Sequence, residues 1–127
     1  MTRSRLIALA AFPLLLLALA GCSRQAALDG DGLAADIATG ETITVHLYQL
    51  SQGMETQAFP CEDDDDGVEV DDPSIVLVTP LGEEEIRTIN QQRPVAMKFA
   101  LTGLKDGRVA LTSRCNGSTS SRYLYVR

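Results

Sequence analysis

Hydrophobic and polar residues alternate over several short stretches of the chain, which is the pattern of strands with one buried face. Residues 42–48 place Ile, Val and Leu opposite Thr, His and Tyr side chains. The run 75–78 is Ile-Val-Leu-Val between Pro73 and Pro80, and it predicts a short strand that is covered on both faces. Residues 83–89 contain three Glu and two Ile and predict a weaker strand.

The C-terminal third shows the alternation most clearly. Apolar side chains share one face over 95–101, 109–115 and 124–126, and turns containing glycine separate these stretches. They predict a meander of three antiparallel strands, with Cys115 on the apolar face of the second. Five to seven short strands in all predict an all-β fold, a small antiparallel β-sandwich or open barrel, over residues 41–127.

The first 21 residues follow a different pattern. Arg3 and Arg5 precede the run 6–20, which is apolar and is interrupted only by Pro13. This run matches the hydrophobic region of an export signal and falls short of the roughly 20 residues that span a bilayer. We therefore interpret residues 1–21 as a signal peptide.

The residues Leu19-Ala20-Gly21-Cys22 resemble the lipobox of bacterial lipoproteins. The resemblance implies that the leader is cleaved before Cys22, that the Cys22 thiol carries diacylglycerol, and that acyl chains anchor the protein to a membrane. Ser23 stands where lipoproteins retained in the inner membrane carry Asp. It therefore implies an outer-membrane anchor, with the domain facing the periplasm. An ordinary signal peptide that happens to be followed by Cys is the alternative.

Residues 23–40 are rich in Gly and Ala and have only weak apolar spacing. This composition predicts that residues 22–40 form the lipidated N-terminus and a flexible tether between the lipid and the β-domain. A short helix over residues 33–37 is the alternative.

Three cysteines are present, and two remain if Cys22 is lipidated. An exported protein meets an oxidising compartment, so we expect Cys61 and Cys115 to form a disulfide that stabilises the small domain. The alternatives are two free buried thiols, or a metal site that includes the single histidine, His46. The spacing of these three residues does not match a zinc site, and we expect no metal.

Charge is divided along the chain. Residues 55–85 contain 12 acidic residues and no Lys or Arg, whereas residues 86–127 contain eight basic residues and one acidic residue. The net charge of the whole chain is −6, and it becomes more negative when the two arginines of the leader are removed. Such a chain is a poor candidate for binding nucleic acid, since phosphate contacts depend on Lys and Arg. In space, the two halves can pair or form opposed faces.

The strongest concentration of charge is the run Asp63-Asp64-Asp65-Asp66. Its simplest interpretation is a solvated, mobile loop. A partner-binding acidic patch made of these four residues is the functional interpretation. A Ca²⁺ site using Asp64, Asp66 and Glu69 is a weaker one, since the full EF-hand pattern is absent.

No motif of an enzyme is present. His46 is the only imidazole and lies on the polar face of its predicted strand, and we expect neither a catalytic site nor a cofactor. The sequence therefore predicts a lipid-anchored, non-enzymatic protein of the cell envelope that binds an envelope protein. The alternative is a periplasmic inhibitor or immunity lipoprotein that acts on a cationic hydrolase or toxin.

Overall fold

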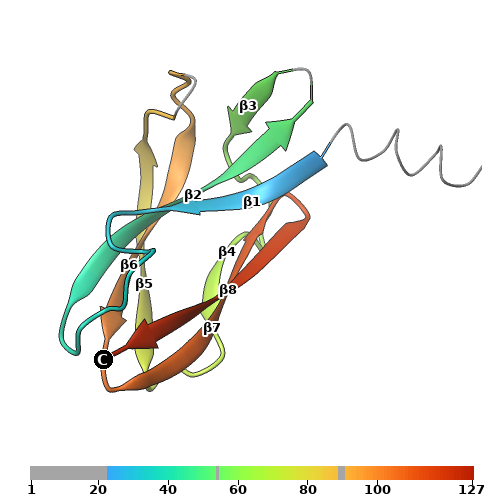
Figure 1. The fold of residues 1–127 in the computed structure, drawn as a ribbon. Coiled ribbons are helices and arrows are strands. Elements are labelled where there is room, and N and C mark those ends of the chain that lie inside the picture. Colours follow the sequence, from blue (N-terminus) through green and yellow to red (C-terminus); the bar gives the residue numbers. More distant parts are fainter. Residues whose placement is uncertain (1–22, 54, 89–90) are drawn as a thin grey trace, which may run out of the picture.

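The computed structural model describes residues 23–53, 55–88 and 91–127, and it contains two antiparallel β-sheets packed face to face (Figure 1). The strands are β1 (Ser23–Asp29), β2 (Thr42–Gln52), β3 (Thr56–Phe59), β4 (Gly67–Val70), β5 (Val76–Glu85), β6 (Val95–Gly103), β7 (Gly107–Cys115) and β8 (Ser118–Val126). One sheet, here sheet A, has the order β1-β2-β6-β5, and β3 pairs with β2; the other, sheet B, has the order β4-β7-β8. The predicted all-β, antiparallel fold is thus confirmed.

The core lies between the two sheets and follows the alternation in the sequence. Sheet A contributes Val45 and Leu47 from β2 and Leu101 from β6, and all three side chains are fully buried. Sheet B contributes Leu111 from β7 and Leu124 from β8, which are buried to the same degree. Burial of these apolar faces is the main favourable contribution to folding of this small domain.

The predicted three-strand meander is wrong. β7 and β8 form a hairpin, but β6 pairs with β2 and β5 in sheet A, so the turn between β6 and β7 crosses from one sheet to the other. In this crossing, the Leu104 backbone N–H donates a hydrogen bond of 2.8 Å to the Ile75 carbonyl. The alternation of apolar and polar residues shows which side chains face the core. It does not show to which of the two sheets a strand belongs, because strands of both sheets have the same alternation.

The expected strand around residues 75–78 is found, but it is not covered on both faces. β5 begins at Val76 and continues through the three glutamates, with a register shift between Pro80 and Glu83. It is an edge strand, and Leu77 is 46% exposed on its outer face. Proline and charged side chains on such an edge hinder pairing with other chains.

The structure also corrects the boundary of the predicted tether. The whole of β1, from Ser23 to Asp29, is hydrogen-bonded to β2, and Ser23 pairs with Gln52. Residues 31–35 form turns rather than the alternative short helix, and they lead to Ile37, which is fully buried and bridges Val126 of β8. The domain therefore includes residues 23–40. The predicted signal peptide, residues 1–21, and Cys22 lie outside the described residues.

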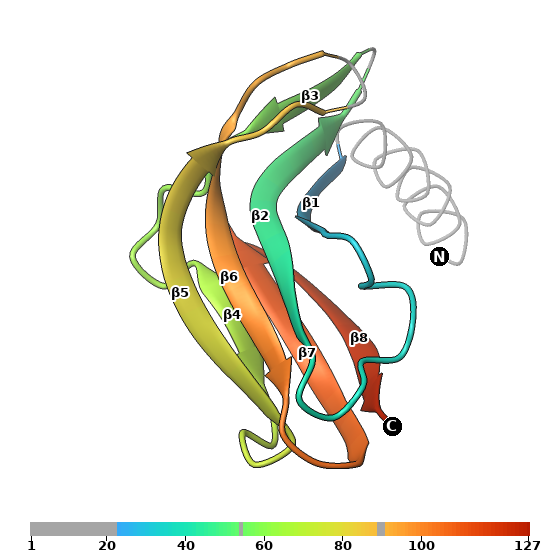
Figure 2. The ribbon, with the colours of Figure 1, turned by 90° about the vertical axis from the view of Figure 1, so that its left-hand side faces the viewer.

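Figure 2 shows the curvature of the long strands of sheet A over sheet B. At one side of the sandwich β1 lies beside β8, and at the other β5 lies beside β4. Within the described residues, no helix is long and apolar enough to cross a membrane.

Candidate functional site

The predicted disulfide is present and connects the two sheets at the start of the acidic run. Cys61 follows β3, and Cys115 is the last residue of β7. Cys115 is fully buried, as its place on the apolar face of β7 predicts. The disulfide therefore fixes the beginning of the β3–β4 loop, residues 60–66, against the core. Both alternatives for these two cysteines, free thiols and metal ligands, are excluded by the bond between them.

Asn116, in the β7–β8 turn, holds the same loop from the other side. Its side-chain amide donates hydrogen bonds to Gln49 Oε1 (2.9 Å) and to the Pro60 carbonyl (2.8 Å), and its Oδ1 accepts one from the Glu62 backbone N–H (2.8 Å). Gln49 is buried, so this amide also satisfies a polar group that would otherwise lie in the core unpaired. Asn116 has a φ of 49°, a conformation that Asn adopts more readily than most residues.

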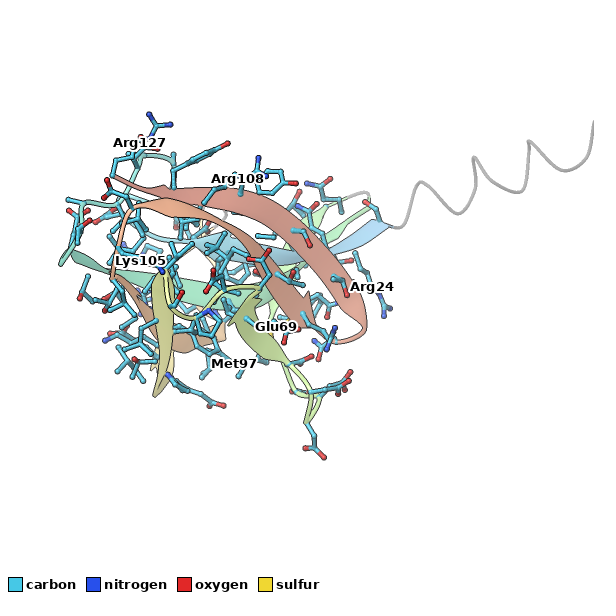
Figure 3. The ribbon with its side chains drawn as sticks, turned by 90° about the horizontal axis from the view of Figure 1, so that it is seen from below. Arg24, Glu69, Met97, Lys105, Arg108 and Arg127 are labelled. Atoms are coloured by element: carbon cyan, nitrogen blue, oxygen red, sulfur yellow. A yellow bond between two sulfur atoms is a disulfide. The ribbon has the colours of Figure 1, made fainter. Side chains whose placement is uncertain are left out.

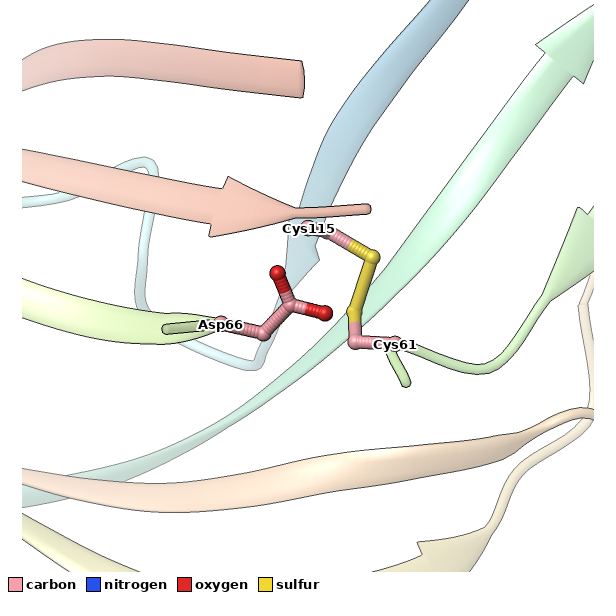
Figure 4. Close-up of side chains that lie close together, drawn as sticks. All are labelled: Cys61, Asp66 and Cys115. Carbon is pink, nitrogen blue, oxygen red and sulfur yellow. A yellow bond between two sulfur atoms is a disulfide. The ribbon is translucent and has the colours of Figure 1, made fainter. Parts of the chain in front are cut away.

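Asp66 closes the loop and is a structural residue. One carboxylate oxygen accepts a hydrogen bond from the Asp63 backbone N–H and the other accepts one from the Asn116 backbone N–H, each of 2.9 Å. Its carboxylate lies beside the disulfide (Figure 4). A negatively charged acceptor strengthens both bonds. The loop is thus anchored by a covalent bond and by a polar network, while its residues 62–65 remain exposed to solvent.

The other three aspartates of the run differ from Asp66. Asp63, Asp64 and Asp65 are exposed, and their carboxylates have no hydrogen bond or ion pair within the part of the chain that the structure describes. The structure thus divides the four predicted partner-binding residues into one internal acceptor and three free carboxylates. These three carboxylates are here called the acidic triad.

A divalent cation would need oxygen ligands that converge on one point. In the described part of the chain, the one cluster of three potential ligands is Asp66 with Cys61 and Cys115. Both sulfur atoms belong to the disulfide and are not thiolates, so this cluster does not offer a metal site. The structure does not bring Asp64, Asp66 and Glu69 together as the Ca²⁺ interpretation requires.

His46 lies on the outer face of sheet A, as the alternation predicts. Its Nε2 is 2.7 Å from Glu84 Oε2, and the Lys98 ammonium is 3.6 Å from the same oxygen. The hydrogen bond from His46, followed by the charge of Lys98, holds the pKa of Glu84 below its usual value. The hollow beside His46 has a volume of about 600 Å³ and is polar and open to solvent. The partner of the His46 Nε2 atom is thus a carboxylate.

The two oppositely charged halves of the sequence partly pair in space. The ion pairs between them are Arg93–Glu85 (3.9 Å), Lys98–Glu84 (3.6 Å) and Arg114–Glu69 (3.9 Å). Arg108 and Arg127 instead stack on tyrosine rings of β8 and lie on the upper side in Figure 3, whereas the yellow-green loop before β4 extends to the lower side. The loop before β4 therefore lies on the opposite side of the sandwich from Arg108 and Arg127, whereas Arg114 of β7 lines a shallow hollow together with Asp65.

Sequence reasoning identified the disulfide and the acidic run but missed the roles of Asn116 and Gln49. The Asn-Gly sequence at 116–117 signals a turn, but the long-range bonds of the asparagine side chain have no signature in the sequence. Comparisons of the chain with protein families, with curated proteins and with solved structures found no match.

Proposed function

We propose that this protein is a lipid-anchored, non-enzymatic protein of the bacterial cell envelope that binds a basic protein partner through the acidic triad, Asp63, Asp64 and Asp65. The observation that carries the proposal is an anchored loop that presents three exposed, unpaired carboxylates. The disulfide, Asn116 and Asp66 already hold the loop, so little conformational entropy is lost when a partner binds. Complementary charge would accelerate the encounter and make binding dependent on salt.

The anchor part of the proposal rests on the residues 19–22 and on the export signal before them. Diacylglycerol on the Cys22 thiol, with a further acyl chain on the new N-terminus, would give stable attachment, since a single chain binds a membrane only marginally. Mass spectrometry of the N-terminal peptide from the membrane fraction tests this part. A peptide that begins at Cys22 and carries diacylglycerol is the expected result, and an unmodified Cys22 would refute it.

The partner is tested by cross-linking and affinity capture of the full lipidated protein from the cells that make it. The test variant is D63N/D64N/D65N, which removes three charges and leaves Asp66 and its hydrogen bonds intact. The matched control is D31N/E55Q/E83Q, which removes three exposed charges elsewhere. We expect a stoichiometric basic envelope protein that is lost with the test variant and retained with the control. Equal capture by both variants would refute the role of the triad.

The same variants, tested with added enzymes, distinguish a resident envelope protein from a cationic hydrolase or toxin as the partner. Capture of an added cationic hydrolase or toxin, with loss of its activity, would identify an inhibitor or immunity protein. Capture of a resident envelope protein without any effect on such enzymes would identify an accessory protein. Binding in both cases should weaken as salt increases.

A further inference from the structure

A polar surface surrounds the point where the leader joins the domain. This surface, here called the β1–β8 surface, comprises Ser23, Arg24, Gln25, Gln52, Ser120 and Arg122, all of them exposed. It combines the first half of β1 with the adjoining end of β2 and the first half of β8, because β1 lies beside β8 at this side of the sandwich. Figure 3 shows Arg24 close to the point where the chain enters β1.

The edges of β1 and β8 do not pair with each other here, and a hollow of about 450 Å³ lies between them. Gln25 lines it from β1, and Ser120 and Arg122 line it from β8. Asp29 also borders the hollow, but its carboxylate accepts the hydrogen bond of the Tyr48 hydroxyl. The hollow thus combines amide and hydroxyl groups and one guanidinium with the Asp29 carboxylate and the apolar side chains of Ala27, Leu28 and Leu50.

Arg24 and Arg122 differ from most cations of the domain. Arg93, Lys98 and Arg114 form ion pairs with glutamates. In contrast, Arg24 and Arg122 have no carboxylate partner and no ring contact in the segments that the structure describes. Arg24 lies at the start of β1, and Arg122 lines the hollow between β1 and β8. Each guanidinium can recognise a phosphate with paired hydrogen bonds.

The position of the anchor relative to this surface selects the source of the phosphate. β1 is hydrogen-bonded to β2 from Ser23 onward, so the chain has no slack between the domain and Cys22. Consecutive Cα atoms are about 3.8 Å apart, so an acyl chain on Cys22 would hold the start of β1 at the level of the lipid headgroups. This step rests on the lipidation proposed above.

We propose that the β1–β8 surface docks on the headgroups of the membrane that carries the anchor, with Arg24 and Arg122 contacting the phosphates of anionic phospholipids. The hydroxyl and amide side chains of Ser23, Gln25 and Ser120 suit the polar headgroup layer. The domain is then held flat on the membrane in one orientation, so its protein partner must also lie at the membrane surface.

The experiment compares backbone amide exchange in the full lipidated protein, held in nanodiscs of phosphatidylcholine alone or of phosphatidylcholine with phosphatidylglycerol. We expect slower exchange in residues 23–28 and 118–122 in the anionic discs. One arginine near an anionic surface changes the ratio of docked to undocked protein about fivefold, so R24Q/R122Q should lower this ratio about 25-fold. K105Q/R108Q, which removes two charges elsewhere, should leave it unchanged.

Equal exchange in both kinds of disc would overturn the proposal, as would equal effects of the two double variants. A third sample contains the protein in neutral detergent with added inorganic phosphate. Protection there equal to that in anionic discs would identify a site for free phosphate and would also overturn membrane docking. The mass of the N-terminal peptide separates the two levels of failure: a lipidated Cys22 without protection refutes only the docking, whereas an unmodified Cys22 refutes the anchor itself.

Discussion

Replacement of Ile37 by alanine distinguishes the structure from the tether that the composition of residues 22–40 suggests. In a tether this side chain would be exposed, and its truncation would have almost no effect. In the structure it is fully buried, and it lies in the same core cluster as Val126. The Ile37 backbone N–H donates to the Tyr125 carbonyl, and the Arg127 N–H donates to the Ile37 carbonyl, each at 2.9 Å. Alanine keeps both hydrogen bonds, so the variant measures the side chain alone.

The expected loss of unfolding free energy is about 3 kcal/mol, because truncation of a fully buried isoleucine removes its transfer free energy and leaves a cavity. The surroundings have little freedom to fill this cavity. A side-chain carbon of Ile37 is 3.3 Å from the position that a Cβ of Gly103 would occupy, and β8 lies beside it. For a domain of this size the loss corresponds to a decrease in Tm of roughly 12 °C, and it is a large part of the about 5–15 kcal/mol that stabilises a typical protein.

Thermal unfolding followed by circular dichroism, in one detergent buffer for all proteins, measures this difference. The conservative variant Ile37→Val should lose only about 1 kcal/mol. The matched control is Leu81→Ala, at a position where the side chain is 47% exposed and the loss should stay below about 0.5 kcal/mol. If Ile37→Ala loses no more stability than Leu81→Ala, Ile37 is not part of the core and the assignment of residues 30–40 to the domain is wrong.

Two further predictions concern the disulfide and the pH dependence of stability. Reduction of the Cys61–Cys115 bond, which joins residues 54 positions apart, should lower the unfolding free energy by about 4 kcal/mol. Denaturation midpoints measured with and without reductant test this difference, and equal midpoints would contradict it. The His46 hydrogen bond, with the charge of Lys98, lowers the pKa of Glu84 in the folded state. Its stabilisation is therefore present above the usual pKa of 4.5 and is lost as pH falls through the lowered value. Unfolding midpoints measured across this acidic range should decrease more steeply for the native protein than for Glu84→Gln, and parallel profiles would argue against the pair.

The candidate site was predictable in its composition but not in its organisation. Four consecutive aspartates and an even number of remaining cysteines are visible in the sequence, and both features belong to the site. Local sequence does not show that Asp66 differs from Asp63, since the difference depends on the Asn116 backbone N–H, which lies 50 positions away. A hydrogen bond between such distant residues exists only after the two sheets have packed.

The fold shows the same division. By itself, the sequence determined the all-β class, the buried faces of β2, β7 and β8 and the disulfide, because side-chain alternation and cysteine pairing are local or countable properties. Only the tertiary structure decided that β6 belongs to a different sheet from β7, that β5 is an exposed edge and that residues 23–40 belong to the domain. Alternation specifies which face of a strand is buried, but it does not specify the neighbouring strand. Leu33 and Ile37 stand in a segment without a regular apolar pattern, so their place in the core could not be predicted from the sequence.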